Sequence, residues 1–247
     1  MEKPIGVHLA QAKCYAYILS VQRGLPEISV QMTYCNLDTE EIRRFRETYS
    51  FQELAKWFED LVTAYGKWAD FQYHAKRERN ASIVGLEFPF PYREGQKKLA
   101  GDVYRTALRG KSLFIQAPTG TGKTITTVFP AVKAVGEGLA EKIFYLTAKT
   151  ITRTVAKEAF DLLRKQGYQG RVIIITAKEK LCFCDEMDCN PVDCVYAKGH
   201  YDRGNDAVFD LLQKERDITR EVLAQQAEKY QVCPFEMCLD LSLWVDD

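Results

Sequence analysis

The sequence has no apolar run that approaches the length of a membrane span, and its amino terminus lacks the apolar core of a secretion signal. It also lacks an excess of charge of either sign, because 34 lysines and arginines balance 34 aspartates and glutamates. Internal repeats and low-complexity tracts are missing too. These absences predict a globular, cytoplasmic protein with no membrane partner. Any nucleic-acid surface on it must be a local patch.

Cysteine, by contrast, is abundant and clustered. Eight cysteines occur, and clustered thiols in a chain without a secretion signal bind metal more often than they form disulfides. Six of them fall near the end of the sequence, namely Cys182, Cys184, Cys189, Cys194, Cys233 and Cys238. Cys14 and Cys35 lie far from this group, and we expect both to be ordinary small hydrophobic residues.

The first 85 residues predict a small α+β region. A helix is expected at 8–23, then a strand at 28–34, in which apolar and polar residues alternate, and a return strand at 41–49. Ser50-Phe51-Gln52-Glu53 is a capping box that opens a helix predicted to run to about Arg79. An irregular basic stretch (74–80) and the prolines of Phe88-Pro89-Phe90-Pro91 then mark a boundary.

Helix and strand alternate after this boundary, which is typical of an α/β fold with a parallel sheet covered by helices. The predicted helices are 94–109, a helix from 123 with Pro130 as its kink or end, and 151–166. The predicted strands are 111–116, which we expect to be buried, 143–147 and 172–176. The cysteine-rich end is expected to hold helices at 205–215, 217–230 and from Cys233.

A glycine-rich loop of the [AG]-x4-G-K-[ST] type follows the strand predicted at 111–116. Its residues are Ala117, Pro118, Thr119, Gly120, Thr121, Gly122, Lys123 and Thr124. Glycines let such a loop turn its N–H groups inward, and the following helix directs its positive end at the same anion. Lys123 would reach the β- and γ-phosphates, and the Thr124 hydroxyl would ligate Mg²⁺. The motif predicts binding of a nucleoside triphosphate, with Lys123 and Thr124 as the catalytic contacts.

Four cysteines are placed as metal ligands from separate loops. Cys189 and Cys194 enclose a compact loop, Cys182 precedes them, and Cys233 begins a helix whose dipole stabilises a thiolate. Four thiolates suit Zn²⁺ or an iron–sulfur cluster, although the paired Cys-x2-Cys knuckles usual in zinc sites do not occur. Cys184 competes with Cys182 as the first ligand. Burial as small hydrophobic residues is the alternative for the whole group.

Together these motifs resemble the iron–sulfur superfamily 2 DNA helicases, the XPD/DinG-like group, over residues 88–247. Arg93 and Gln96 match the family's adenine-recognising segment, and Thr147 and Lys149 match its motif Ia contacts to single-stranded DNA. The family's four [4Fe–4S] ligands correspond to Cys182, Cys189, Cys194 and Cys233. The resemblance implies a RecA-like P-loop NTPase domain with a helical iron–sulfur insertion. It also implies ATP with Mg²⁺, a [4Fe–4S] cluster, and single-stranded or forked DNA as a partner.

The first region resembles the RecB-like PD-(D/E)xK nucleases. Gln11 and Tyr15 match the family's Q-x3-Y helix, in which the two side chains lie one turn apart and face the active site and DNA. An ordinary amphipathic helix is the alternative. The family's metal-binding Asp and Glu-x-Lys would precede Gln11, where this sequence has no counterpart, so we do not expect nuclease activity.

These resemblances lead us to expect part of a larger enzyme. Residues 1–85 would be the end of a nuclease-like domain, 86–177 the first part of a helicase motor domain, and 178–247 an iron–sulfur domain. The D-E-A-H box and second motor domain would follow, so we expect negligible ATP turnover by this chain alone. Asp185-Glu186-Met187-Asp188 resembles that box, but no strand precedes it and we expect a solvated turn. The alternatives are a cysteine-rich DNA-binding module with a vestigial phosphate loop and a zinc-stabilised P-loop ATPase.

Overall fold

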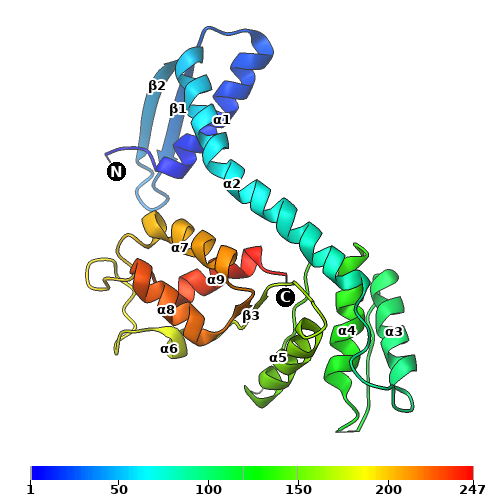
Figure 1. Cartoon of the computed structure of the whole chain (residues 1–247). Coiled ribbons are helices and arrows are strands. Elements are labelled where there is room, and N and C mark those ends of the chain that lie inside the picture. The colour runs from blue at the N-terminus through cyan, green and yellow to red at the C-terminus, as the bar shows by residue number, and fades with distance from the viewer. Residues whose placement is uncertain (1, 119, 149, 247) are drawn as a thin grey trace. The chain divides into compact units, whose positions relative to one another are not determined.

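The structure is a computed structural model that describes residues 2–118, 120–148 and 150–246 (Figure 1). The chain divides into two compact units, Met1–Phe71 and Gln72–Asp247, at a point inside the long helix α2 (Phe51–Val84). Each unit has its own hydrophobic core. In the described part of the chain, no helix combines the length and the apolar character needed to cross a membrane.

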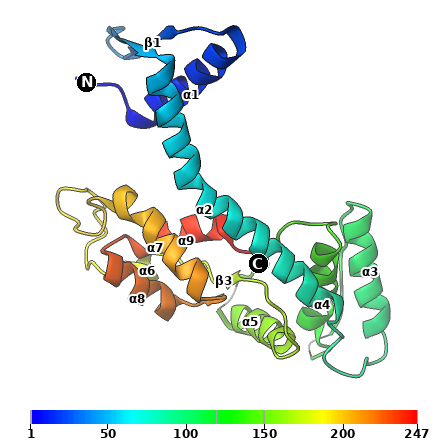
Figure 2. The same ribbon diagram turned by 45° about the horizontal axis from the view of Figure 1, so that its top comes forward.

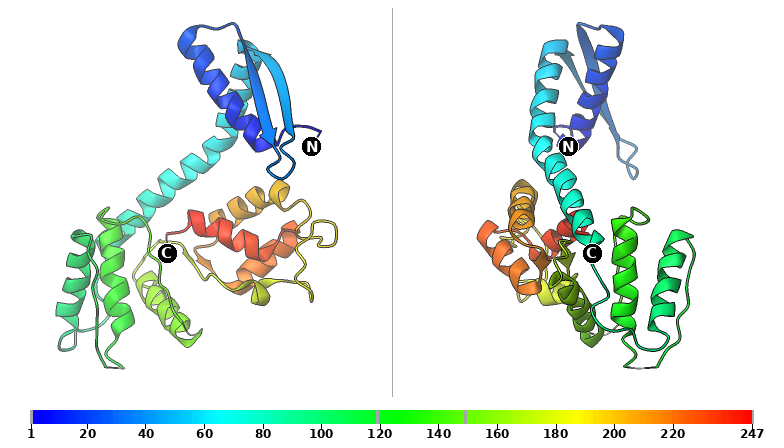
Figure 3. Two further views of the ribbon diagram at one scale, coloured as in Figure 1. Left: turned by 180° about the vertical axis from the view of Figure 1, so that it is seen from behind. Right: turned by 45° about the vertical axis from the view of Figure 1, so that its right-hand side comes forward.

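The first unit packs helix α1 (Gly6–Arg23) and the start of α2 against a hairpin (Figure 3). Strands β1 (Glu27–Cys35) and β2 (Ile42–Ser50) are antiparallel, with Val30 opposite Glu47. Alternate residues of β1 face the helices, as the period-two pattern predicts. The core consists of Ala16, Val30 and Leu54, against which Leu9, Ala12, Tyr17, Ile28, Met32 and Tyr49 pack.

Helix α2 begins with the capping box that the sequence predicts. Ser50 Oγ accepts a hydrogen bond from Glu53 N at 3.2 Å, and Glu53 Oε2 accepts one from Ser50 N at 2.8 Å. Two otherwise unpaired backbone donors are thereby satisfied. The same hydrogen bonds hold the pKa of Glu53 below its usual value, so the carboxylate stays ionised at neutral pH. This prediction is confirmed.

The second unit contains a core built by the end of α2, α4 (Lys123–Gly136) and α5 (Thr150–Arg164), and α3 (Gln96–Leu108) packs against α4. The buried residues are Ile83, Leu86, Ile125, Val128, Phe129, Val132, Ala159, Phe160, Leu163, Tyr168 and Val172. Lys133 ties α4 to the end of α2, because its Nζ donates to Ile83 O at 2.9 Å. Such a cation at a helix C-terminus also meets the negative end of the helix dipole.

The cysteine-rich part of this unit is helical. The short helix α6 (Lys178–Leu181) precedes α7 (His200–Lys214), α8 (Arg220–Tyr230) and α9 (Pro234–Trp244), and these last three pack on one another (Figure 2). Their interior is fully buried and includes Leu212, Leu223, Met237 and Leu241. Strands β3 (Val172–Ile173) and β4 (Asp217–Ile218) pair in parallel. As predicted, α9 follows Cys233 directly, with Pro234 at its first position.

The extended parallel sheet predicted for residues 86–177 does not form in the part of the chain that the structure describes. Residues 111–116 and 143–147 form no strand, and β3 covers only 172–173. The segments predicted as strands are open to solvent, with Phe114 95% and Leu146 90% exposed. A strand exists only when a neighbouring strand satisfies its backbone, and no partner strand lies beside these segments among the described residues.

Three predicted helix limits also differ from the structure. Helix α2 continues through the stretch 74–80, which the sequence suggested was irregular, to Val84. Helix α4 passes through Pro130, where burial in the core offsets the one backbone hydrogen bond that proline removes. Residues 217–218 form β4, and α8 begins only after Thr219, whose side chain accepts from Val222 N. In each case tertiary packing outweighs local sequence preference.

Candidate functional site

The glycine-rich loop leads directly into α4, as the motif predicts. Gly120 and Gly122 have φ angles of 79° and 70°, in the left-handed region that favours glycine. Gly122 is also tightly packed, since an added Cβ would lie 2.7 Å from Gln96 Nε2. Thr119, a predicted nucleotide contact, lies outside the described residues. The loop and the N-terminus of α4 together form the arrangement that binds phosphate in proteins.

Lys123 folds back over the loop. Its Nζ donates to Ala117 O at 2.8 Å and to Pro118 O at 2.6 Å. The Thr121 hydroxyl donates to the same Pro118 carbonyl at 2.9 Å. Hydrogen bonds from ammonium to phosphate are stronger than those to a neutral carbonyl, so a bound phosphate can replace these partners.

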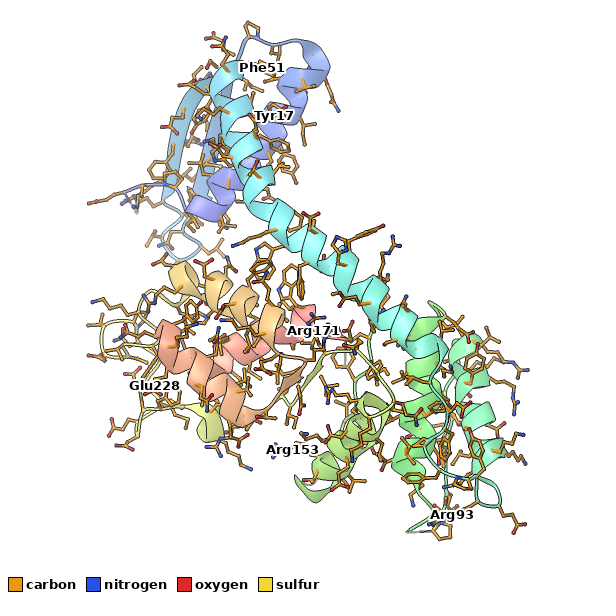
Figure 4. All side chains as sticks on the ribbon, in the orientation of Figure 1. Tyr17, Phe51, Arg93, Arg153, Arg171 and Glu228 are labelled. Carbon is orange, nitrogen blue, oxygen red and sulfur yellow. The ribbon has the colours of Figure 1, made fainter. Side chains whose placement is uncertain are left out.

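Two predicted residues brace the loop from the side. The buried Gln96 donates from Nε2 to Thr121 O at 2.8 Å, and its Oε1 accepts from Arg93 N at 2.8 Å. The Arg93 guanidinium donates to Gly120 O at 3.0 Å, and its position is labelled in Figure 4. The structure therefore brings the predicted adenine-binding segment and the phosphate loop into direct contact.

An aromatic pair next to this brace is a feature that the motifs do not reveal. The rings of Phe88 and Tyr92 stack with centroids 4.2 Å apart, and Phe88 meets Phe129 of α4 edge-on at 5.6 Å. Partial burial raises the pKa of Tyr92, which remains 40% exposed. In the sequence, the run of aromatic residues and prolines at 88–92 indicates packing at this point but does not predict which rings stack.

The segment predicted to contact DNA lies beside the predicted Mg²⁺ ligand. The Tyr145 hydroxyl donates to Thr124 Oγ1 at 3.5 Å, a long contact that the sequence does not predict. The Thr147 hydroxyl lies 2.8 Å from that of Thr152 in α5. Lys149, the second predicted DNA contact, lies outside the described residues. Tyr145, which makes this contact with Thr124, is only two residues before Thr147 in the chain.

A cavity of about 600 Å³ separates residues 142–148 from residues 172–177. Arg153 and Lys157 of α5 also line it, and Figure 4 labels Arg153 on that helix. At one end the backbone of Asp246 bridges the two walls: Ile143 N donates to Asp246 O, and Asp246 N donates to Arg171 O, both at 3.1 Å. Through these bonds Asp246 connects residue 143 of one predicted strand to Arg171, which directly precedes another.

A second cavity, of about 180 Å³, gathers the cysteines. Its walls include the four predicted ligands and the competitor, that is Cys182, Cys184, Cys189, Cys194 and Cys233. The Sγ atoms of Cys184 and Cys194 lie 3.9 Å apart, and this contact is the main reason that the pKa of Cys184 is raised to about 11. Among the described residues, no three histidine, cysteine, aspartate or glutamate side chains lie close enough to hold one metal ion. The thiols therefore surround a common space without converging on one point.

Residues of helices α6 and α7 contact these cysteines. Burial raises the pKa of Cys233, whose backbone N–H donates to His200 Nδ1 at 3.2 Å. A hydrogen bond with Cys189 raises the pKa of Lys178, the first residue of α6. This lysine is missed by the sequence reasoning, because nothing in the chain's spacing links residue 178 to the cysteines.

The remaining predicted residues are also placed by the structure. Gln11 and Tyr15 both lie exposed on α1, one turn apart. Residues 185–188 lie exposed in the loop before Cys189 and belong to no strand, as expected for a solvated turn. Cys35 is exposed, whereas Cys238 is completely buried in the helical core and does not line the cysteine cavity.

Residues 97–190 match the DEAD/DEAH box helicase family. The match covers less than half of the chain, and it contains the phosphate loop, the Tyr145–Thr147 segment and the first three cysteines of the cavity. It supports a helicase superfamily, a P-loop NTPase fold and an ATP-dependent helicase-type function. No curated protein and no solved structure matches the chain.

The helicase match gives the loop geometry its chemical meaning. A DEAD/DEAH helicase domain implies ATP with Mg²⁺ and supports nucleic acid as a partner. The matched residues begin directly after Gln96, so the brace formed by Arg93 and Gln96 lies at its edge. Cys194 and Cys233 lie beyond its end, and their role rests on the geometry of the cavity.

Proposed function

We propose that the chain is part of an iron–sulfur DNA helicase of the XPD/DinG-like group, with the end of a nuclease-like domain ahead of the motor. The observation that carries this proposal is the single cavity lined by Cys182, Cys189, Cys194 and Cys233. It lies in the same compact unit as a phosphate loop inside a helicase match. Residues 1–85, 86–177 and 178–247 are the proposed nuclease-like, motor and iron–sulfur parts.

The donor set suits a [4Fe–4S] cluster better than a single ion. Four ligands of one tetrahedral zinc, at about 2.3 Å each, would lie roughly 3.8 Å from one another. The described residues contain no three-donor group of that kind, although five thiols line the cavity. In a cluster each cysteine binds a different iron, so its ligands are spread around the cluster. When bound, the cluster would stiffen the loops that connect α6, α7 and α9.

ATP binding is assigned to the brace and the loop. Gln96 and Arg93 hold the loop. On ATP binding, Lys123 would exchange its carbonyl partners for β- and γ-phosphate oxygens, and Thr124 would be the ligand for Mg²⁺. We assign Thr147 and Lys149 to the phosphates of single-stranded DNA. The hydrogen bond between Tyr145 and Thr124 would couple this segment to the nucleotide site, because a movement of Thr124 would shift Tyr145 and, two residues on, Thr147. In the complete motor, ATP hydrolysis would drive movement along this strand and the iron–sulfur part would guide it at a fork.

A second candidate, a zinc-stabilised P-loop ATPase, is favoured by one observation. The 3.9 Å between Cys184 and Cys194 is close to the spacing of two thiolates on one zinc ion. Two further ligands at that distance would be required, and the described residues do not supply them. The two candidates share the phosphate loop and differ in inorganic sulfide, which only the cluster contains.

Titration with a fluorescent ATP analogue and Mg²⁺ tests the motor assignment. We expect Lys123→Ala to weaken binding at least tenfold, about 1.4 kcal/mol, because the loop loses its only positive side chain. Lys98→Ala, which removes an exposed lysine of α3, is the matched control and should bind as the parent does. Equal affinity in all three proteins would indicate a vestigial loop. Lys123-dependent ATP turnover by this chain would contradict our expectation that hydrolysis needs further parts of the motor.

A further inference from the structure

The cysteine cavity contains one thiol more than a [4Fe–4S] cluster uses. Five cysteines line it, and a cluster of this kind takes four. The fifth is not remote, because the Sγ atoms of Cys184 and Cys194 lie 3.9 Å apart, about the spacing of two thiolates on one metal ion. The fifth thiol therefore has a role other than that of a cluster ligand.

The distance between Cys184 and Cys194 identifies which of the five is surplus. Thiolates bound to different irons of a cluster lie farther apart than two thiolates on one metal ion, which are roughly 3.8 Å apart. The two Sγ atoms at 3.9 Å therefore do not fit two separate corners of the cluster. Because Cys194 belongs to the proposed ligand set, Cys184 would be the non-ligand partner in that set, with Cys182 as the first ligand.

The chain around both thiols can adjust. Residues 183–199 form turns and bends without a helix or a strand, so neither cysteine is held by regular structure. Both side chains are partly exposed, which gives small oxidants access. A disulfide requires the sulfur atoms to approach to about 2.05 Å, and no helix or strand hydrogen bonds have to break for residues 183–199 to make that shift.

We infer that Cys184 and Cys194 form a reversible disulfide when iron is not bound, so that the cavity is a site of oxidative modification. The inference rests on the proposed function in one respect, because Cys194 serves either as cluster ligand or as disulfide partner. Iron binding and disulfide formation are then mutually exclusive. In a reducing cell such a disulfide is transient and restores the ligand set when it is reduced.

A peroxide is the oxidant that this chemistry requires. The Cys194 thiolate attacks hydrogen peroxide, the O–O bond breaks, and Cys194 sulfenic acid and hydroxide are formed. The Cys184 thiol then attacks the sulfenic sulfur, the S–S bond forms, and the proton leaves with the hydroxyl group as water. Overall two thiols lose two hydrogen atoms and one peroxide becomes two waters. A small thiol reductant reverses the step.

The test compares iron-free and iron-loaded protein after exposure to hydrogen peroxide. Iron and sulfide content are measured first, and the peptides are then mapped without reductant. We expect a peptide pair joined through Cys184 and Cys194 in the iron-free protein and at least a tenfold smaller amount in the iron-loaded protein. Cys184→Ser should form no such pair. Cys35→Ser, which removes an exposed cysteine of the other unit, should form it as the parent does.

The other outcomes are equally decisive. A link between Cys184 and Cys182, or oxidation of Cys184 to a sulfinic acid without any link, would overturn the inference. So would the same yield of disulfide with iron bound, because Cys194 would then not be shared. Failure of the proposed function is seen separately, as protein that takes up no iron and sulfide under any condition, whatever its disulfides.

Discussion

At the scale of single residues, the phosphate loop depends on a glycine that no other residue replaces. Gly122 has a φ of 70°, and a Cβ there would lie 2.7 Å from Gln96 Nε2. A side chain would therefore cost about 1–2 kcal/mol of backbone strain and would also displace the brace. We predict that Gly122→Ala weakens nucleotide affinity by about 5- to 30-fold in the fluorescence titration.

The matched control for this prediction is Gly24→Ala. Gly24 also has a positive φ, 64°, but an added Cβ there meets nothing within 4 Å, and it belongs to the other unit. Its substitution should lower stability slightly and leave nucleotide affinity unchanged. Equal losses of affinity in both variants would show that the effect does not arise from the loop and its contact with Gln96.

Asp210 governs how one helical pair responds to acid. Its carboxylate accepts from Lys214 Nζ at 2.5 Å, Gln226 Nε2 at 3.0 Å and Lys229 Nζ at 2.9 Å, and these bonds hold its pKa well below the usual value. The ionised form is thus favoured in the folded protein. Its stabilising effect is present above the ordinary carboxyl pKa of about 3.9 and is lost as pH falls below it.

We therefore predict that Asp210→Asn lowers the thermal midpoint at pH 7. The difference should shrink progressively as pH falls below about 3.9, and should disappear only when the pH reaches the lowered pKa of the folded state. Glu228→Gln is the matched control, since Glu228 lies exposed on α8 (Figure 4) and should change the midpoint little across this pH range. Thermal scans monitored by circular dichroism measure both. A constant difference between parent and Asp210→Asn at all pH values would contradict the electrostatic explanation.

At the scale of secondary-structure elements, one buried ion pair ties three segments together. Arg79 of α2 is buried, and its Nη1 lies 2.5 Å from Asp246 Oδ1. The other carboxylate oxygen accepts from Arg171 N at 3.0 Å, just before β3. Loss of one partner leaves a buried charge without compensation, which costs about 3–5 kcal/mol.

We predict that Asp246→Ala lowers the free energy of unfolding of the second unit by about 3–5 kcal/mol, as measured by urea denaturation. Adding Arg79→Met should recover part of the loss, because the uncompensated charge is then removed as well. Asp102→Ala breaks an exposed pair with Arg105 and should cost less than about 1 kcal/mol. A loss of that small size in Asp246→Ala would mean that the pair is not buried in solution.

The elements also show what local sequence can and cannot predict. Periodicity and capping residues predict the helices, the hairpin and the capping box at Ser50. Most of the predicted limits lie within a few residues of those in the structure. The strands predicted at 111–116 and 143–147 do not form, since a strand depends on partners that its own sequence does not contain. In the site, Lys123 begins α4 and donates to the loop carbonyls, and its contact with phosphate stays a prediction. Tyr145 and Lys178 were not predicted as site residues, because their contacts with Thr124 and Cys189 arise only when the chain folds.

At the scale of the whole molecule, two compact units meet inside one continuous helix, α2. The second unit holds both the phosphate loop and the cysteine cavity, with the helicase match running from one to the other. We propose that this cavity holds a [4Fe–4S] cluster. Three of the four cysteines concerned lie between residues 182 and 194, and folding brings the distant Cys233 to the same cavity.

The most direct test of this claim is the content of iron, zinc and acid-labile sulfide in protein purified without oxygen, beside Cys189→Ser. The account predicts about four irons and four sulfides per chain in the parent, with loss of both in the variant. The Cys35→Ser control should keep them. Stoichiometric zinc without sulfide, or iron that Cys189→Ser retains, would contradict it.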